Sequence, residues 1–263
     1  MSSPRSLCVA AVATIVLPVV LLAQGGRGGE PPKNLQVLPK DTPRQQVIAT
    51  MNTFTAALGV RCEHCHIEDA NAQPPAGAAP GGGRGGPPLN FAADDKEQKK
   101  VAREMLKMVN DINTKYLPLT GRTIGDRNRV SCETCHHGLA KPATLRAALA
   151  GAAEAKGADS ATALYRDLRA KYYGSAAYDF SESSLAVAAT ELARANQRPA
   201  ALALLKLNLE FYDRSAATYQ AMGQIQLQAG DTAAAITALR KAASFQPTNP
   251  QIQQMLQRLG ISP

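Results

Sequence analysis

The sequence contains no Trp, and aromatic residues make up only 5% of its 263 residues. Aromatic side chains usually supply much of the area buried in a core, so a chain of this length needs another source of buried apolar surface. A large prosthetic group or a helical repeat would supply it. The chain also lacks a long run of Lys or Arg, although its net charge is +8. We therefore interpret the positive charge as spread over solvated helix faces, and expect no nucleic-acid partner.

Long apolar runs are missing too, apart from one near the N-terminus. Residues 7–22 are almost wholly apolar and follow Arg5. This run is shorter than about 18 residues and contains Pro18, so it predicts an export signal over residues 1–24 rather than a spanning helix. The residue two before Ala23 is Leu21 and not a small one, which leaves an uncleaved anchor open. We expect a periplasmic protein, associated with the membrane if the leader stays uncleaved.

All four cysteines outside the leader lie in two C-x-x-C-H motifs, which is the attachment pattern of haem c. The two thiols form thioethers with the haem vinyl groups, and the next residue, His, binds the iron from below. Its other ring nitrogen should donate to a backbone carbonyl. The motifs are Cys62, Cys65 and His66, and Cys132, Cys135 and His136. They predict two covalently bound haem c groups, with both histidines as iron ligands.

Two other interpretations of the cysteines are a zinc site built from both pairs and a pair of thiol redox motifs. Neither explains why a His follows directly after each pair. A zinc site of four thiolates also fits poorly with an oxidising compartment. The haem interpretation is therefore favoured.

A haem iron that only transfers electrons usually has a second axial ligand, and Met suits this role because it raises the potential. A helix is predicted ahead of the first motif, with Thr42 as N-cap, Pro43 in the first position and Gly59 at its end. Met51 on this helix is our candidate ligand for the first haem, and the alternative is a plain core residue. The apolar face of the helix consists of Val47, Met51, Phe54 and Leu58.

A second helix is predicted over residues 94–116, ahead of the second motif. Met105 and Met108 lie on one apolar face of it, and their spacing alone does not decide which one binds the second haem. The other two histidines, His64 and His137, would have to bend back to reach a haem. Each haem also carries two anionic propionates that need cationic partners. The candidates for that role are Arg61, Arg122, Arg127 and Arg129.

The composition changes along the chain. Residues 71–89 form a Gly/Pro-rich segment, which we expect to be a flexible loop, and no strand pattern appears before Pro142. Residues 143–263 are rich in Ala and Leu and show a period of 34 residues, the tetratricopeptide length. Stacked helical hairpins of this kind are usually docking surfaces, and the alternative is a plain helical cap. The repeat positions are Tyr219, Gly223, Gly230, Ala235, Leu239, Ala242 and Pro247, with Leu185, Ala189, Leu192, Ala201 and Leu205 one period earlier, and Ala161, Tyr165 and Leu168 in a partial first unit.

The segment from about Pro32 to Pro142 resembles the cytochrome c subunit of photosynthetic reaction centres. The resemblance implies that Met51 is the ligand of the first haem. It also favours Met105, the first Met of its stretch, over Met108 for the second haem. The family typically holds four haems, so this chain resembles one half of it, and His137 stands where the family often has Arg. The matching stretches are residues 58–66, 90–92, 102–108, 111–113, 130–136 and Gly138.

We therefore predict an all-α protein, with a dihaem cytochrome c domain over residues 25–142 and a tetratricopeptide-like domain over residues 143–263. It is expected to carry electrons and not to be an enzyme. Its expected partner is a redox protein such as a membrane-bound reaction centre or respiratory complex, docked through the repeats. The alternatives are a two-haem peroxidase-like enzyme, which needs one displaceable iron ligand, and a docking protein whose haems sense redox state.

Overall fold

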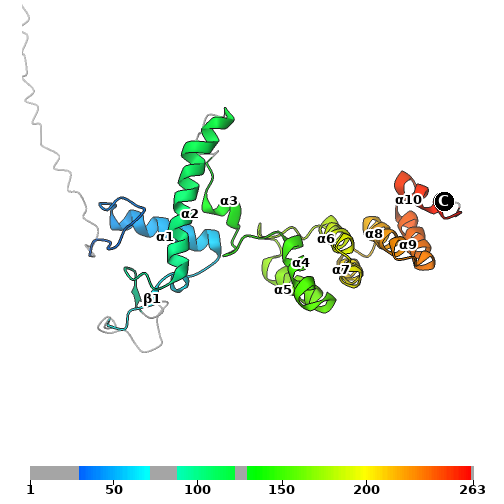
Figure 1. Cartoon of the computed structure of the whole chain (residues 1–263), viewed down its shortest axis with the longest axis horizontal. Coiled ribbons are helices and arrows are strands. Elements are labelled where there is room, and N and C mark those ends of the chain that lie inside the picture. The colour runs from blue at the N-terminus through cyan, green and yellow to red at the C-terminus, as the bar shows by residue number, and fades with distance from the viewer. Residues whose placement is uncertain (1–29, 72–87, 122–128, 262–263) are drawn as a thin grey trace, which may run out of the picture.

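The computed structural model describes residues 30–71, 88–121 and 129–261 (Figure 1). These residues are mostly helical, which confirms the all-α prediction. The expected export signal, residues 1–24, and most of the expected loop at 71–89 lie outside them. No helix among the described residues is long and apolar enough to cross a membrane.

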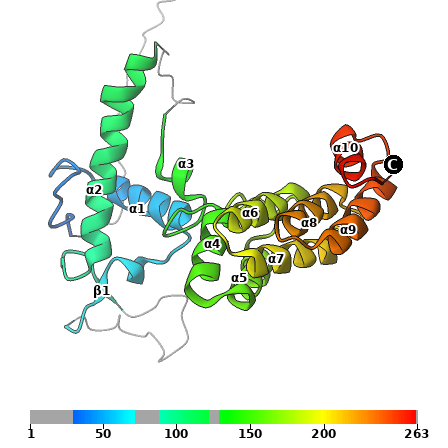
Figure 2. The same cartoon turned by 45° about the vertical axis from the view of Figure 1, so that its right-hand side comes forward.

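The first part of the chain holds both C-x-x-C-H motifs on short helical elements. Helix α1 crosses helix α2, and the C-terminal end of α2 stands away from the rest of the chain in both views (Figures 1 and 2). Helix α3 packs against α1. The elements are α1 (Arg44–Leu58), the 3-10 turn η1 (Cys62–His64), α2 (Glu97–Asp111), the π-helical turn η2 (Ile112–Tyr116), the 3-10 turn η3 (Leu117–Thr120) and α3 (Cys132–His136).

Helix α1 differs from its prediction at the N-terminus. Pro43, with an extended backbone, is the N-cap, and the Thr42 hydroxyl instead donates to the carbonyl of Pro39 at 2.6 Å. The predictions of Thr42 as N-cap and Pro43 in the first helical position were therefore wrong by one residue, because the helix begins at Arg44 and Thr42 belongs to the turn before it. Gly59 ends the helix in the left-handed conformation, as predicted, with φ of 65°.

The second predicted helix begins later than expected and changes its winding. Lys96 still has an extended backbone, so α2 begins at Glu97 rather than near Asp94. Beyond Asp111 the helix widens into η2, which reaches Tyr116 as predicted. The Pro118 ring lies in the 3-10 turn that follows.

A short antiparallel strand pair lies beside the first motif, where no strand pattern was visible in the sequence. It joins β1 (Ile67–Glu68) to β2 (Leu89–Asn90), with Ile67 opposite Asn90. Strands of two residues are too short to show alternation. The pair places the residue after His66 next to the segment that leads into α2.

The second part of the chain consists of three helical hairpins and a closing helix, arranged in a row (Figure 2). The α8 helix begins 34 residues after α6, and α9 begins 34 residues after α7, which agrees with the period seen in the sequence. A closing helix was expected at residues 250–260 and is present. The elements are α4 (Leu145–Lys156), α5 (Ala158–Tyr172), α6 (Glu182–Arg194), α7 (Arg198–Phe211), α8 (Ala216–Gln228), α9 (Thr232–Phe245) and α10 (Pro250–Arg258).

The hydrophobic core lies in these hairpins. Tyr165, Leu185 and Leu205 are completely buried in one cluster, and Leu239 lies in a second cluster under α10. Gly223 on α8 is needed for this packing, because a Cβ atom there would lie 2.7 Å from the Leu239 side chain. The small residue on α8 therefore lets the large residue on α9 approach closely.

The part before the hairpins has almost no core of its own. Among the described residues ahead of Leu139, Ala57 is the only buried apolar side chain. By contrast, several large apolar side chains there are exposed. They are Ile48, Phe91, Val101, Met105, Met108, Tyr116 and Leu119.

Candidate functional site

The first motif lies on η1, directly after the end of α1. Arg61 has an extended backbone and leads into the turn. Cys62 is exposed, Cys65 is half-buried, and neither forms a disulfide. His66 is only 9% exposed, and its ring meets the edge of Phe91 with 4.9 Å between the ring centroids. Two accessible thiols therefore stand beside a sheltered imidazole.

The His66 imidazole lacks the expected hydrogen bond to a carbonyl. Its Nδ1 is buried and has no partner among the described residues. The pKa of His66 is lowered, first by burial and then by the positive charges of Lys99, Lys96 and Arg103. The neutral ring is the form that binds a metal, so this environment favours the binding form.

The cations near His66 are fixed by Asp94 and by the turn before α2. The Asp94 carboxylate pairs with Lys99 at 2.9 Å and with Arg103 at 2.8 Å. The Lys99 ammonium also donates to the carbonyls of residues 91–93. Hydrogen bonds from Arg103, Asn34 and Lys99 hold the pKa of Asp94 well below its usual range. The side chains of Lys99 and Arg103 are only 12% and 14% exposed.

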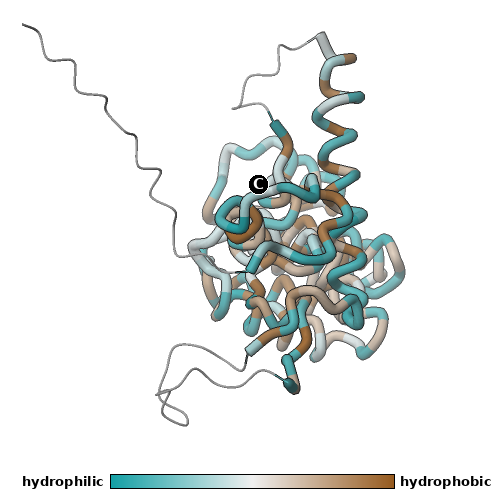
Figure 3. The backbone as a smooth tube through the Cα atoms, turned by 90° about the vertical axis from the view of Figure 1, so that its left-hand side faces the viewer, coloured by the Kyte–Doolittle hydropathy of each residue, from teal (hydrophilic) through white to brown (hydrophobic). Residues whose placement is uncertain are grey.

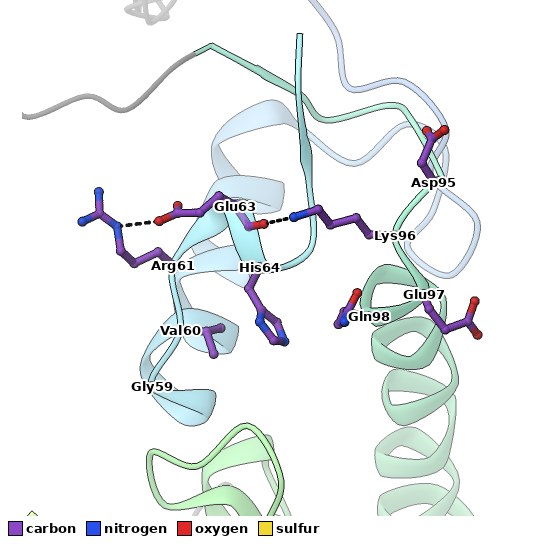
Figure 4. Close-up of a pocket in the computed structure, with 9 residues that line it drawn as sticks. All are labelled: Gly59, Val60, Arg61, Glu63, His64, Asp95, Lys96, Glu97 and Gln98. Carbon is purple, nitrogen blue, oxygen red and sulfur yellow. Dashed lines mark hydrogen bonds and ion pairs between the residues drawn. The ribbon is translucent and has the colours of Figure 1, made fainter. Parts of the chain in front are cut away.

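An open hollow of about 680 Å³ separates η1 from the N-terminus of α2. The imidazole of His64 points into it, and the Lys96 ammonium reaches across to the Glu63 carbonyl (Figure 4). Arg61, a predicted propionate partner, forms an ion pair with Glu63 at 2.9 Å. The hollow therefore presents polar and cationic groups beside the first motif.

The second motif lies on α3, which has a capped N-terminus. The Thr134 hydroxyl accepts a hydrogen bond from the Ser131 N–H at 3.0 Å. His136 Nδ1 lies 2.7 Å from the Leu139 carbonyl. Since a carbonyl can only accept, Nδ1 carries the proton and Nε2 keeps a free lone pair. This is the hydrogen bond that we predicted for a proximal haem ligand.

Asn113 fixes the chain that enters the second motif, and sequence reasoning gave it no role. Its buried side chain accepts from the Val130 N–H and donates to the Val130 carbonyl, both at 2.8 Å. Asn113 lies on η2, so this amide joins the end of α2 to the residue two before Cys132. The partners are 17 residues apart, and no pattern in the sequence links them.

The end of α1 contacts the exit of the second motif. The Gly138 N–H donates to the Ala57 carbonyl at 2.8 Å. A Cβ atom on Gly59 would lie 2.2 Å from the Gly138 carbonyl oxygen, so only Gly fits there. The helix that carries Met51 thus touches the second motif as well as leading into the first.

The three candidate methionines lie on two helices. Met51 is half-buried on α1. Met105 and Met108 are 39% and 46% exposed and share an outward face of α2 with Val101. Apolar positions recur along the projecting end of α2 (Figure 3). No described residue covers this apolar row, and Met105 and Met108 are both available on it.

The remaining candidates are peripheral. His137 ends α3 with a left-handed backbone, φ of 48°, and is exposed. Arg129 is exposed as well, and Arg122 and Arg127 lie outside the described residues.

Sequence reasoning also gave no role to the cations near His66. Lys99 and Arg103 stand four residues apart, which places them on one face of α2, but nothing in the sequence places that face beside His66.

The cysteines and histidines of the two motifs fit covalently attached haem. All four cysteines of the motifs are free thiols, and at least one imidazole is held in the tautomer that leaves Nε2 open. Among the described residues, no cluster of three or more His, Cys, Asp or Glu side chains is arranged to hold a metal ion. The structure therefore does not bring the two cysteine pairs together as a zinc site would require.

Comparison with known proteins supports the resemblance seen in the sequence. Residues 79–185 match the family described as the photosynthetic reaction centre cytochrome C subunit. Cytochrome c-554 from Chloroflexus aurantiacus is 32% identical over 104 residues, which cover 40% of this chain and 20% of that protein. No solved structure matches. The matches confirm the resemblance to this family and support a c-type cytochrome in electron transfer, with haem c bound covalently.

Proposed function

We propose that this chain is a periplasmic dihaem c-type cytochrome that transfers electrons. The premise is its resemblance to the reaction centre cytochrome c subunit family. Cys62 and Cys65 hold one haem and Cys132 and Cys135 hold the other, so each motif supplies two thioethers. His66 and His136 supply the proximal imidazoles. The family match covers the second motif and α2, and the first motif has the same residue types at the same spacing.

The observation that carries this proposal is the missing core around the two motifs. Ala57 is the only buried apolar side chain described ahead of Leu139, while Met105, Met108 and Val101 are exposed on one helix. Contiguous apolar surface of this kind marks a site that another group covers. A haem bonded to each motif supplies the apolar area that the aromatic-poor sequence does not.

The methionines complete the proposed iron coordination. Met51 is assigned to the first haem and Met105 to the second, with Met108 as the alternative for the second. When bound, each haem supplies an iron that gains and loses one electron. With His66 and Met51 on one iron and His136 and Met105 on the other, the chain would supply two ligands to each iron, which would keep the change in ligand geometry small and keep other ligands away. This arrangement suits an electron carrier better than an enzyme.

The helical hairpins of residues 143–263 are proposed as a tetratricopeptide-like docking surface. Support comes from the 34-residue offset between successive hairpins and from a core shared by neighbouring helices. The proposed partner is a redox protein such as a membrane-bound reaction centre or respiratory complex. Export through the leader would bring the chain to the periplasm, where haem c is attached to such proteins.

The haem count is tested by weighing the denatured protein after expression in cells competent in cytochrome maturation. We expect the mass of the chain plus two porphyrins. The double variants Cys62→Ala/Cys65→Ala and Cys132→Ala/Cys135→Ala serve as matched controls, and each should retain one porphyrin. A wild-type mass without two added porphyrins would contradict the proposal.

The role as an electron carrier is tested by spectroscopy. Both irons should be low-spin, and peroxide should not be turned over. A high-spin iron with peroxidase turnover would favour a two-haem enzyme instead.

The docking role of the repeats is tested by deletion of residues 143–263. If the repeats only dock, the deletion should leave the spectrum and the potentials unchanged and abolish partner binding.

A further inference from the structure

The two proximal histidines differ in the hydrogen bond at Nδ1. His136 donates to the Leu139 carbonyl at 2.7 Å, whereas the buried Nδ1 of His66 has no partner among the described residues. A hydrogen bond from Nδ1 makes an imidazole a more basic ligand. A more basic ligand stabilises the oxidised iron and lowers its potential. His66 makes no such bond to a described residue, so within the part of the chain that the structure describes it is the weaker donor of the two.

Cations also lie close to His66. Lys96 donates to the Glu63 carbonyl in the first motif, and Lys99 donates to the carbonyl of Phe91, whose ring meets the His66 ring. The Asp94 carboxylate pairs with Lys99 and Arg103. The Lys99 and Arg103 side chains are largely shielded from water, so solvent and salt screen their charges less than those of exposed residues. Fixed positive charge opposes the extra positive charge of an oxidised iron. It therefore favours the reduced iron at this site.

We infer, on the basis of the proposed dihaem function, that the haem at Cys62 and Cys65 has the higher potential of the two. The hydrogen-bond difference and the cations near His66 both act in this direction. One electron shared by the pair then rests at the first motif: the iron above His136 is oxidised from Fe²⁺ to Fe³⁺, and the iron above His66 is reduced from Fe³⁺ to Fe²⁺. The second motif, next to the helical hairpins, becomes the donor side of the molecule.

The inference is tested by redox titration of the holoprotein, followed by absorbance. Lys99→Gln removes a positive charge near His66 and should shift the upper potential downward. Asp94→Asn leaves Lys99 and Arg103 uncompensated and should shift the upper potential upward. Both variants should leave the lower potential in place. Lys100→Gln is the matched control, because this neighbouring side chain is 53% exposed and pairs with Glu97; it should move neither potential measurably.

Opposite shifts separate an electrostatic effect from a structural one. Lys99→Gln and Asp94→Asn break the same ion pair, so a purely structural effect would move the potential in the same direction in both variants. If opposite shifts appear only in the lower potential, the order of the haems is the reverse of the one inferred. If neither variant shifts a potential, the inference is overturned. The mass of each variant is measured first. A protein that lacks two porphyrins contradicts the proposed function. A protein that carries two porphyrins but whose potentials do not move contradicts only this inference.

Discussion

The two C-x-x-C-H motifs share one residue pattern and lie in different surroundings. The first is a 3-10 turn with a buried histidine, an aromatic neighbour and a group of cations. The second is a capped α-helix whose histidine bonds to a carbonyl three residues ahead. In the proposed function, the motif specifies where a haem is attached, while residues from elsewhere in the chain determine the environment of its iron. The predictions below probe this difference.

The largest expected effect comes from the proposed methionine ligands. Met51→Ala should abolish the low-spin signature and lower the potential at the first haem only, and Met105→Ala should do so at the second, because the thioether ligand is lost. Electron paramagnetic resonance and redox titration measure both changes. Met108→Ala is the matched control on the same face of α2. If Met108→Ala shows the loss and Met105→Ala is silent, Met108 is the ligand.

Gly59→Ala should destabilise the junction between α1 and the second motif. The new Cβ would clash with the Gly138 carbonyl, and the left-handed backbone adds strain, so we expect a loss of roughly 2–4 kcal/mol in the free energy of unfolding. Gly138→Ala is the control, since its φ is 86° but its Cβ would meet no atom within 4 Å. It should cost only the strain, about 1–2 kcal/mol. Equal losses in urea unfolding would show that the contact with Gly138 is unimportant.

Asn113→Ala should act on the second motif alone. It leaves the N–H and the carbonyl of Val130 without their partner, which costs about 1–3 kcal/mol. We expect a shifted spectrum or potential for the second haem and none for the first. Thr114→Ala, at an exposed position next to it, is the control and should have little effect. A change at the first haem of comparable size would mean that α2 transmits the disturbance to both motifs.

The smallest effect concerns the ion pairs beside the first motif. The pKa of Asp94 is depressed in the folded protein, so its contribution to stability is present above its usual value of 3.8 and is lost as the pH falls through the folded pKa. The difference in urea midpoint between the wild type and Asp94→Asn should therefore shrink as the pH is lowered below that value. A difference that is constant with pH would show that Asp94 does not stabilise the fold through its charge.

Local patterns in the sequence predicted the helices well. The apolar spacing around Met51 and the glycine after it predicted α1 to its last residue, and the 34-residue period predicted the offset of the hairpins. Thr42 as N-cap was wrong by one position, because the helix begins one residue later and Pro43 is its N-cap. The short strands at Ile67 and Leu89 were missed, because two residues show no periodicity.

The environment of the site was less predictable because it depends on contacts between distant residues. The bond from His136 to a carbonyl followed from the chemistry of the motif, since its partner is only three residues away. Asn113 meets Val130 across 17 residues, and Lys99 approaches His66 only because a strand pair and a turn bring α2 beside η1. Nothing in a single sequence indicates such approaches.

Under the proposed dihaem function, the exposed apolar row on α2 has a consequence for maturation. Val101, Met105 and Met108 would be open to proteases and to other unfolded chains until both porphyrins were attached. Attachment of haem would then serve as quality control, because only the matured molecule would hide this row. Cells that lack the maturation machinery should accumulate fragments of the polypeptide rather than an intact colourless protein.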